Sequence, residues 1–225
     1  MAALSGLSPR AYAAGSDKVR LGLIGCGGRG MHDTLRCLIS APNVELVALG
    51  DIFKERVDSA RRRFTSRPVD DEGKPTSDNV ADKVKLTEEN CFAGWDAHTK
   101  VLATDVDMVI LTTPPQFRPM MLKAAVEAGK HVFMEKPVAV DPVGVRSVIA
   151  SSELANQKGL TIVAGTQMRR ISHLVEAMKR IRDGALGTIQ SGQCFRLGGA
   201  MRGWGPQERD PSWSEMEWQL RRWLF

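Results

Sequence analysis

The chain has 225 residues, of which 43% are hydrophobic, and a formal net charge of +5. This length allows one large domain or a domain and a half with a substantial core. The basic residues are spread over many segments and accompany a single tyrosine, so the sequence does not predict a nucleic-acid-binding surface. No run approaches the roughly eighteen apolar residues of a membrane-spanning helix. The four cysteines lie far apart and lack the spacing of a metal site, so we expect no metal.

Residues 1–17 precede the regular part of the chain. Ala11-Tyr12-Ala13 has the small-x-small form of a signal-peptidase site, but the charged n-region of a signal peptide is missing upstream of it. Two interpretations stay open for this segment: a disordered tail, or the remnant of an export signal.

From Val19 onward, predicted strands and helices alternate. Strands are expected at 19–25, 44–51, 107–113, 131–135 and 160–165, and helices at 31–40, 52–64, 119–129, 142–158 and 172–184. This alternation predicts an α/β fold of the Rossmann type, a doubly wound parallel sheet. Residues 66–90 are polar and without a sustained period, which favours a surface insertion. Residues 188–197 are typical of a first strand in a second, open antiparallel sheet of an α+β domain, and the tryptophan-rich stretch after them has no clear period.

A glycine-rich loop follows the first predicted strand. Residues 25–30, GCGGRG, fit the pattern G-x-G-x-x-G, open a predicted helix, and are followed about twenty residues later by Asp51 at the end of the second strand. In a dinucleotide-binding loop, Gly25 allows the tight turn, Gly27 lets the backbone approach the pyrophosphate, and Gly30 permits close packing of helix on strand. A plain strand-turn-helix without a ligand is the alternative.

Asp51 bears on the choice of cofactor. A carboxylate there can accept hydrogen bonds from both ribose hydroxyls and repel a 2'-phosphate, which favours NAD over NADP. Arg29 and Arg56 are close enough in sequence to keep NADP open as the less favoured choice.

Two further predicted strands are followed by candidate ligand-binding residues. In a doubly wound sheet, ligands bind beyond the carboxyl ends of the strands. Residues 112–115, TTPP, are expected along the cofactor near its nicotinamide half, with a proline-made turn as the alternative. Lys136 follows the strand HVFM at 131–134. It is placed to handle the hydroxyl proton of a secondary alcohol while a hydride leaves the carbon. A surface lysine in an ion pair is the competing interpretation. The residues expected to contact the cofactor are Gly25, Gly27, Gly28, Arg29, Gly30, Asp51, Thr112, Thr113, Pro114, Glu135 and Lys136.

These motifs, together with AAVEAGKHVFMEKPVAVD at 124–141 and GTQMRR at 165–170, resemble the Gfo/Idh/MocA oxidoreductases, the glucose-fructose oxidoreductase and inositol dehydrogenase group. The resemblance implies an NAD-binding Rossmann domain over 18–140 and, over 141–225, linking helices and an incomplete substrate and oligomerisation domain. It implies that Glu135 contacts the nicotinamide ribose and that Lys136 is the catalytic or substrate-orienting lysine. Gln167, Arg169 and Arg170 are implied near a sugar or cyclitol substrate, with a solvated helix start as the alternative for the arginines.

The resemblance also sets expectations for the whole protein. Family members run well beyond 300 residues, so we expect the chain to be truncated in its C-terminal domain and weakly active or inactive alone, with a homo-oligomer formed at full length. An NAD-dependent sugar or polyol dehydrogenase is the leading hypothesis. An NAD-recycling glycosidase of the same family and a non-catalytic nucleotide- or sugar-binding module are the alternatives. The branch that it resembles is often made with a twin-arginine signal, which implies a periplasmic location if the native start lies upstream and a cytoplasmic one otherwise.

Overall fold

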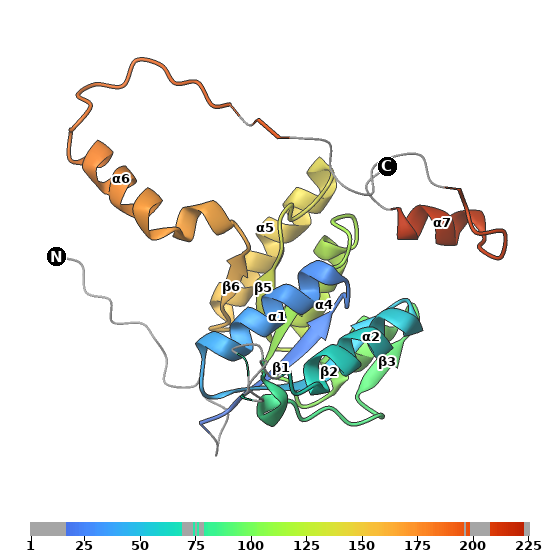
Figure 1. Cartoon of the computed structure of the whole chain (residues 1–225). Helices are drawn as coiled ribbons and strands as arrows, with labels where there is room; N and C mark the ends of the chain where they lie inside the picture. The colour runs from blue at the N-terminus through green and yellow to red at the C-terminus, as the bar shows by residue number, and fades with distance from the viewer. Residues whose placement is uncertain are drawn as a thin grey trace. The chain divides into compact units, whose positions relative to one another are not determined.

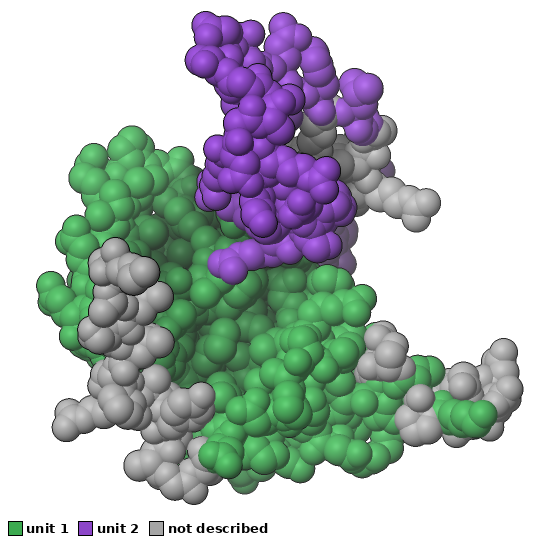
Figure 2. Space-filling model, turned by 90° about the vertical axis from the view of Figure 1, so that its left-hand side faces the viewer, with its two compact units in different colours: residues 1–166 green, residues 167–225 purple. Residues whose placement is uncertain are grey.

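The structure of the chain is a computed structural model that describes residues 17–68, 74, 76, 79–195, 197–198 and 208–222. It divides into two compact units, residues 1–166 and 167–225 (Figure 2). The predicted tail lies outside the described residues except for Asp17.

The first unit is built on a six-stranded sheet in the order β3-β2-β1-β4-β5-β6. All its neighbouring strands pair in parallel. The strands are β1 (Val19–Ile24), β2 (Val44–Asp51), β3 (Cys91–Ala93), β4 (Met108–Leu111), β5 (His131–Met134) and β6 (Ile162–Ala164). The order runs outward from β1 in both directions, which confirms the predicted doubly wound Rossmann sheet. In such a sheet, ligands bind beyond the carboxyl ends of the strands at the point where the order reverses, here between β1 and β4.

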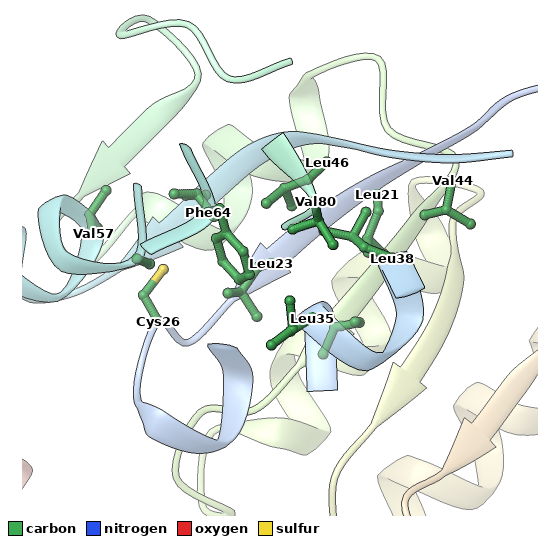
Figure 3. Close-up of a cluster of buried hydrophobic side chains, with 13 residues drawn as sticks. Leu21, Leu23, Cys26, Leu35, Leu38, Val44, Leu46, Val57, Phe64 and Val80 are labelled. Atoms are coloured by element: carbon green, nitrogen blue, oxygen red, sulfur yellow. The ribbon is translucent and has the colours of Figure 1, made fainter. Parts of the chain in front are cut away.

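Helices cover both faces of this sheet. The elements are α1 (Gly28–Ser40), α2 (Lys54–Thr65), η2 (Ala81–Lys83), α3 (Ala97–Ala103), α4 (Arg118–Glu127) and α5 (Pro142–Gln157). Helices α1 and α2 lie on one face of the sheet (Figure 1), and one buried cluster joins them to it through Leu35, Leu38 and Phe64 (Figure 3). A second cluster joins α3, α4 and α5 to the sheet through residues such as Leu122 and Ala155. The crossovers therefore form the two outer layers expected of a parallel sheet.

Side chains alternate between these two clusters along each central strand. In β1, Leu21 and Leu23 belong to the α1 and α2 side, whereas Ile24 belongs to the other. The register of β1 against β2 shifts between Leu21 and Gly22, which adds one residue to β2 at that point. Because a strand has a side-chain period of two, the extra residue lets Val47 and Ala48 both pack on the second cluster.

Helix α5 begins where the sequence predicts. The Asp141 carboxylate accepts a hydrogen bond from the backbone N–H of Gly144 at 2.6 Å, and Pro142 occupies the first helical position. An aspartate N-cap followed by proline satisfies a free N–H and needs no donor from the proline itself.

Strand β3 and helix α3 were not predicted from the sequence. Strand β3 has three residues and helix α3 has seven, so neither shows a sustained period. The predicted surface insertion is also only partly correct, because Val80 at its end is buried in the α1 and α2 cluster and Val84 forms a bridge to Leu46. Tertiary packing, rather than any local pattern, brings these residues into the core.

The sheet continues beyond residue 140, where the sequence placed the end of the Rossmann domain. Helix α5 packs against α4, β6 pairs with β5, and the first compact unit ends at Thr166.

The second unit contains η3 (Gln167–Arg170), α6 (Ser172–Arg182) and α7 (Glu215–Arg221). The predicted antiparallel strand at 188–197 is wrong, because none of the described residues 188–195 and 197 has strand structure. A strand needs a hydrogen-bonding neighbour, and the described part of this unit supplies none. In α7, Trp218 lies 6.1 Å from Trp213 between ring centroids. Trp204 and Trp223 lie outside the described residues.

Over the part of the chain that the structure describes, no helix has the length and apolar character needed to cross a membrane.

A charged link ties the start of β1 to the residue before β4. Asp107 accepts hydrogen bonds from the Arg20 backbone N–H at 2.8 Å, from its Nε at 3.0 Å and from its Nη2 at 2.8 Å. Burial would raise the pKa of Asp107, but the hydrogen bonds from Arg20 outweigh it and hold the pKa below its ordinary value.

We expect Asp107→Asn to lower the free energy of unfolding by about 1 to 2 kcal/mol at neutral pH, because it weakens a charge-assisted pair. A carboxyl with a depressed folded-state pKa stabilises the fold above its unfolded pKa and loses that contribution as the pH falls through the folded pKa. The difference in free energy of unfolding between wild type and Asp107→Asn should therefore shrink as the pH falls. Urea unfolding at a series of pH values from 7 downward measures this difference. Asp58→Asn, in the exposed Lys54–Asp58 pair, is the control. A gap that stays constant with pH would contradict the assignment.

Candidate functional site

The glycine loop packs tightly against the end of β4. Gly25 has a φ of +99°, and a Cβ there would stand 2.7 Å from the backbone nitrogen of Thr113. A Cβ on Gly30 would overlap the carbonyl oxygen of Gly25 and Oγ1 of Thr112. Thr112 in turn donates its hydroxyl to the Gly25 carbonyl at 2.7 Å. Because Gly25 and Gly30 lack a Cβ, they allow β1, α1 and β4 to pack closely together.

Gly27 and Gly28 stand in different surroundings. A Cβ on either would meet no described atom within 4 Å. Helix α1 begins at Gly28 with Gly27 as its N-cap, without a side-chain cap and without an acidic residue in its first turn. The first N–H groups of a helix lack partners within the helix and attract anions. The backbone here has both the space and the donors that a phosphate requires.

Asp51 holds the glycine loop in place. Its side chain is buried, its Oδ2 accepts the N–H of Cys26 at 2.7 Å, and its Oδ1 accepts the N–H of Phe53 at 3.0 Å. A carboxylate accepts about four hydrogen bonds, so the expected bonds to ribose hydroxyls stay a prediction that these contacts allow. No local pattern in the sequence indicates that Asp51 also holds the glycine loop through the N–H of Cys26.

The TTPP segment follows β4 and lies beside the loop. Thr113 places its hydroxyl 3.3 Å from the sulfur of Met121. The carbonyl of Pro114 accepts the N–H of Phe117 at 3.1 Å, so the prolines do form a turn into α4. Contact of Thr112, Thr113 and Pro114 with a cofactor stays a prediction.

Glu135 and Lys136 follow β5 at the same edge of the sheet. Glu135 is buried, and its Oε2 accepts the N–H of Lys136 at 3.1 Å. A Cβ on Gly165, just after β6, would overlap Glu135 Oε1, so this glycine leaves room for the carboxylate. Lys136 is exposed, and the peptide bond to Pro137 is cis. Among the described residues, no carboxylate forms an ion pair with the Lys136 ammonium. The competing interpretation, a surface lysine held in an ion pair, therefore gains no support.

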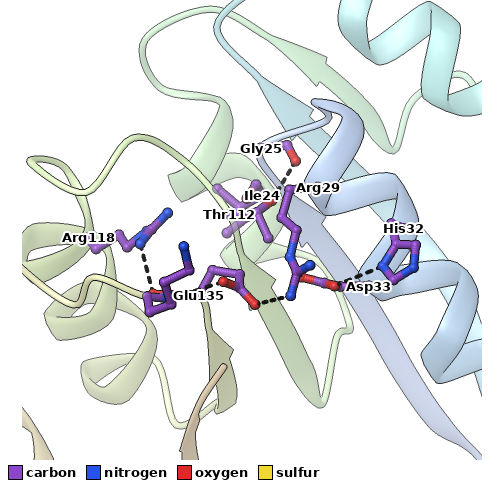
Figure 4. A network of polar contacts seen from close by, with 9 residues as sticks. Ile24, Gly25, Arg29, His32, Asp33, Thr112, Arg118 and Glu135 are labelled. Atoms are coloured by element: carbon purple, nitrogen blue, oxygen red, sulfur yellow. Dashed lines mark hydrogen bonds and ion pairs between the residues drawn. The ribbon is translucent and has the colours of Figure 1, made fainter. Parts of the chain in front are cut away.

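Arg29 links the glycine loop to Glu135. Its Nη2 lies 2.6 Å from Oε1 of Glu135, and its Nε lies 3.1 Å from Oδ2 of Asp33 one turn further along α1 (Figure 4). Burial raises the pKa of Asp33, an effect that His32 and Arg29 oppose. Arg29 is predicted to contact the cofactor. In this structure it is the counter-ion of two carboxylates.

Arg118 is the main residue that the sequence analysis missed. Its side chain is buried at the start of α4. It donates to the Glu135 carbonyl at 2.8 Å (Figure 4). It also donates to the Thr113 carbonyl at 2.8 Å and to the Pro137 carbonyl at 2.5 Å. Burial lowers the pKa of Arg118, and the Glu135 carboxylate opposes this shift. Arg118 therefore fixes the turns after β4 and β5 to each other. In the sequence, Arg118 stands directly before the predicted helix that begins at Pro119, and no local pattern indicates that it joins the two turns.

Gln167, Arg169 and Arg170 lie in η3 of the second unit, and all three are exposed. Their role toward a substrate stays a prediction.

The arrangement gathers three kinds of group at the carboxyl edge of one parallel sheet. They are the backbone N–H groups of the first turn of α1, the buried carboxylates of Asp51 and Glu135, and the exposed ammonium of Lys136. Such an edge can bind an extended anionic ligand and present a proton-handling group at one end. Within the described ranges, no group of three or more His, Cys, Asp or Glu side chains is placed to hold a metal ion.

Comparison with known proteins gives relatives of two kinds. The chain is 27% identical over 165 residues to the inositol 2-dehydrogenase of Klebsiella pneumoniae, a match over 73% of this chain and 41% of that protein. It is 31% identical over 139 residues to glycosyl hydrolase family 109 protein 1 of Bacteroides fragilis, over 61% of this chain and 26% of that protein. The chain thus spans less than half the length of these relatives.

Solved structures share the fold. The WlbA dehydrogenase of Chromobacterium violaceum, in complex with NADH and UDP-GlcNAcA, matches with a TM-score of 0.56 and 25% identity, over 77% of this chain and 42% of that one. A 3-ketoreductase of Actinomadura kijaniata, in complex with NADP and TDP-benzene, matches with a TM-score of 0.55 and 22% identity, over 76% of this chain and 44% of that one. The family GFO_IDH_MocA, described as an oxidoreductase family with an NAD-binding Rossmann fold, matches residues 19–166. The chain belongs to this Gfo/Idh/MocA oxidoreductase family.

Proposed function

We propose that the chain carries the nicotinamide-binding half of an enzyme that transfers a hydride between NAD and a secondary alcohol of a sugar or cyclitol. The observation that carries the proposal is the position of Lys136. Its exposed ammonium follows β5 at the sheet edge that also holds the open glycine loop. Both lie in the part of the chain that the family matches.

The chain's own residues account for cofactor binding in three parts. The space beside Gly27 and Gly28 and the N–H groups at the start of α1, which have no side-chain cap, suit a pyrophosphate. The Asp51 carboxylate suits the adenosine ribose and disfavours a 2'-phosphate, which supports NAD over NADP. Arg56 lies over the Phe53 ring at 4.9 Å from its centroid, and we do not assign it to a phosphate.

When bound, the nicotinamide cofactor supplies the hydride acceptor and donor. As a neutral amine, Lys136 would accept the proton of the substrate hydroxyl at its Nζ during oxidation, and as an ammonium it would return that proton during reduction. Arg118 would keep the Lys136 turn fixed through the carbonyls of Glu135 and Pro137. Glu135 would accept a hydrogen bond from the nicotinamide ribose. Gln167, Arg169 and Arg170 are proposed to contact the substrate.

A second activity is supported by a specific observation. The relatives at 31% identity are named glycosyl hydrolase family 109 proteins. An NAD-recycling glycosidase would use the same cofactor site and the same lysine, but it would return the hydride to the sugar after cleavage.

The test measures binding and turnover on a full-length version of the protein, because the chain spans less than half the length of its relatives. Isothermal titration with NAD should show one site, and Lys136→Met should retain binding while lowering any turnover by about 100-fold or more, because it removes a proton-handling group. Exposed Lys123 on α4, replaced by Met, is the matched control. Cyclitols should yield NADH in proportion to substrate for a dehydrogenase, whereas aryl glycosides should release the aglycone without net NADH for a glycosidase. NAD binding without either product would favour a non-catalytic module, and the absence of NAD binding at millimolar concentration would overturn the proposal.

A further inference from the structure

The buried carboxylate of Glu135 depends on a cation from the glycine loop. Its side chain is 3% exposed, whereas that of Arg29 is 44% exposed, and the two residues are 106 positions apart in sequence. Removing a carboxylate from water costs several kcal/mol unless an opposite charge stands beside it. In this structure, Arg29 supplies that charge (Figure 4).

The same cation stands beside the proposed phosphate site. Arg29 lies in the first turn of α1, next to the open space at Gly27 and Gly28. A guanidinium binds phosphate at least as well as carboxylate, through the same paired N–H geometry. A pyrophosphate at the start of α1 and the carboxylate of Glu135 therefore compete for Arg29.

The structure also indicates which partner moves when the two separate. Glu135 is fixed, because its Oε2 accepts the Lys136 N–H and its Oε1 fills the space left by the missing Cβ of Gly165. Arg29 extends from the helix surface and is the exposed member of the pair. The buried guanidinium of Arg118 stays close enough to Glu135 for their charges to interact, so the carboxylate keeps one cation after Arg29 leaves.

We propose that Arg29 is an exchangeable clamp, which pairs with Glu135 as long as no dinucleotide is bound and turns to the pyrophosphate when one binds. This inference rests on the proposed function. The exchange leaves Glu135 without its closest partner, and only a ligand that also offers hydroxyl donors at Glu135 compensates for it. The pair thus selects an intact dinucleotide over a fragment that carries the pyrophosphate alone, such as ADP.

A double-mutant cycle on ligand affinity tests this inference without any measurement of turnover. NAD and ADP are titrated calorimetrically into wild type, Glu135→Gln, Arg29→Gln and the double variant. Glu135→Gln frees Arg29 and should tighten ADP binding by about 10-fold, in the range typical of allosteric couplings. NAD should gain less, because the variant also loses a ribose acceptor, so the preference for NAD over ADP should fall. Arg29→Gln should weaken ADP binding by about 10-fold in the Glu135→Gln background and by much less in the wild-type background.

Two controls keep the cycle interpretable. Glu45→Gln removes a carboxylate that pairs with Lys18 at the start of β2, the strand end opposite to the site, and should leave both affinities unchanged. Arg29→Lys retains a cation and should bind ADP with an affinity between those of wild type and Arg29→Gln. It takes the place of Arg29→Gln in the cycle if that variant proves unstable in thermal unfolding. Equal effects of Arg29→Gln in both backgrounds, or no gain of ADP affinity in Glu135→Gln, would overturn the clamp while NAD binding to wild type upholds the proposed function. A wild type that binds neither ligand would overturn both.

Discussion

Replacing Arg118 by methionine is expected to lower the free energy of unfolding by about 3 kcal/mol or more, the largest effect that we predict for a single side chain outside the core. The variant keeps the aliphatic part but removes the donors to the carbonyls of Thr113, Glu135 and Pro137. Hydrogen bonds to charged groups contribute about 1.5 to 3 kcal/mol each, and a buried acceptor left without a donor adds its desolvation cost. Urea unfolding followed by circular dichroism measures the change.

The matched control for this experiment is Arg146→Met on the exposed side of α5. It removes the same guanidinium from a surface position and should change stability by less than about 0.5 kcal/mol. Arg118→Lys should restore only part of the loss, because an ammonium is a compact charge that does not present the guanidinium fork. Comparable midpoints for Arg118→Met and Arg146→Met would show that Arg118 does not join the two turns.

Gly30→Ala is expected to destabilise the protein by about 2 to 3 kcal/mol, because it over-packs a tight contact. Its Cβ would overlap the Gly25 carbonyl oxygen and the Thr112 hydroxyl, so α1 or the end of β4 must shift. The hydroxyl of Thr112 would then lose its bond to Gly25. Unfolding midpoints and NAD affinity should both fall.

Gly27→Ala separates packing from ligand binding in the same loop. Its Cβ would enter open space, and the backbone at Gly27 is extended, with φ −73° and ψ 178°. Stability should change by less than about 1 kcal/mol, the usual range for an N-cap substitution. Dinucleotide affinity should nevertheless fall, because the new methyl group occupies the space proposed for the pyrophosphate. A loss of stability as large as that of Gly30→Ala would contradict the assigned roles of the two glycines.

The regular part of the fold was predictable from local patterns. Long strands such as β2 and capped helices such as α5 carry their own signals, an apolar run in one and Asp141 with Pro142 in the other. Strand β3 and helix α3 were missed because three and seven residues show no period. The strand expected at 188–197 failed for the opposite reason, since the described part of the second unit offers this local pattern no neighbouring strand with which to pair.

The sequence by itself determined the order of strands and helices in the first unit, and with it the edge at which the glycine loop, Asp51 and Lys136 meet. Parallel strands joined by helices all end at one edge, so a residue after a strand is placed by the chain order alone. Only the tertiary structure decided which side chains meet there: Asp51 with the N–H of Cys26, and Arg29 with Glu135. These contacts join segments 25 and 106 positions apart. They depend on how helices pack on the sheet, which side-chain periodicity does not encode.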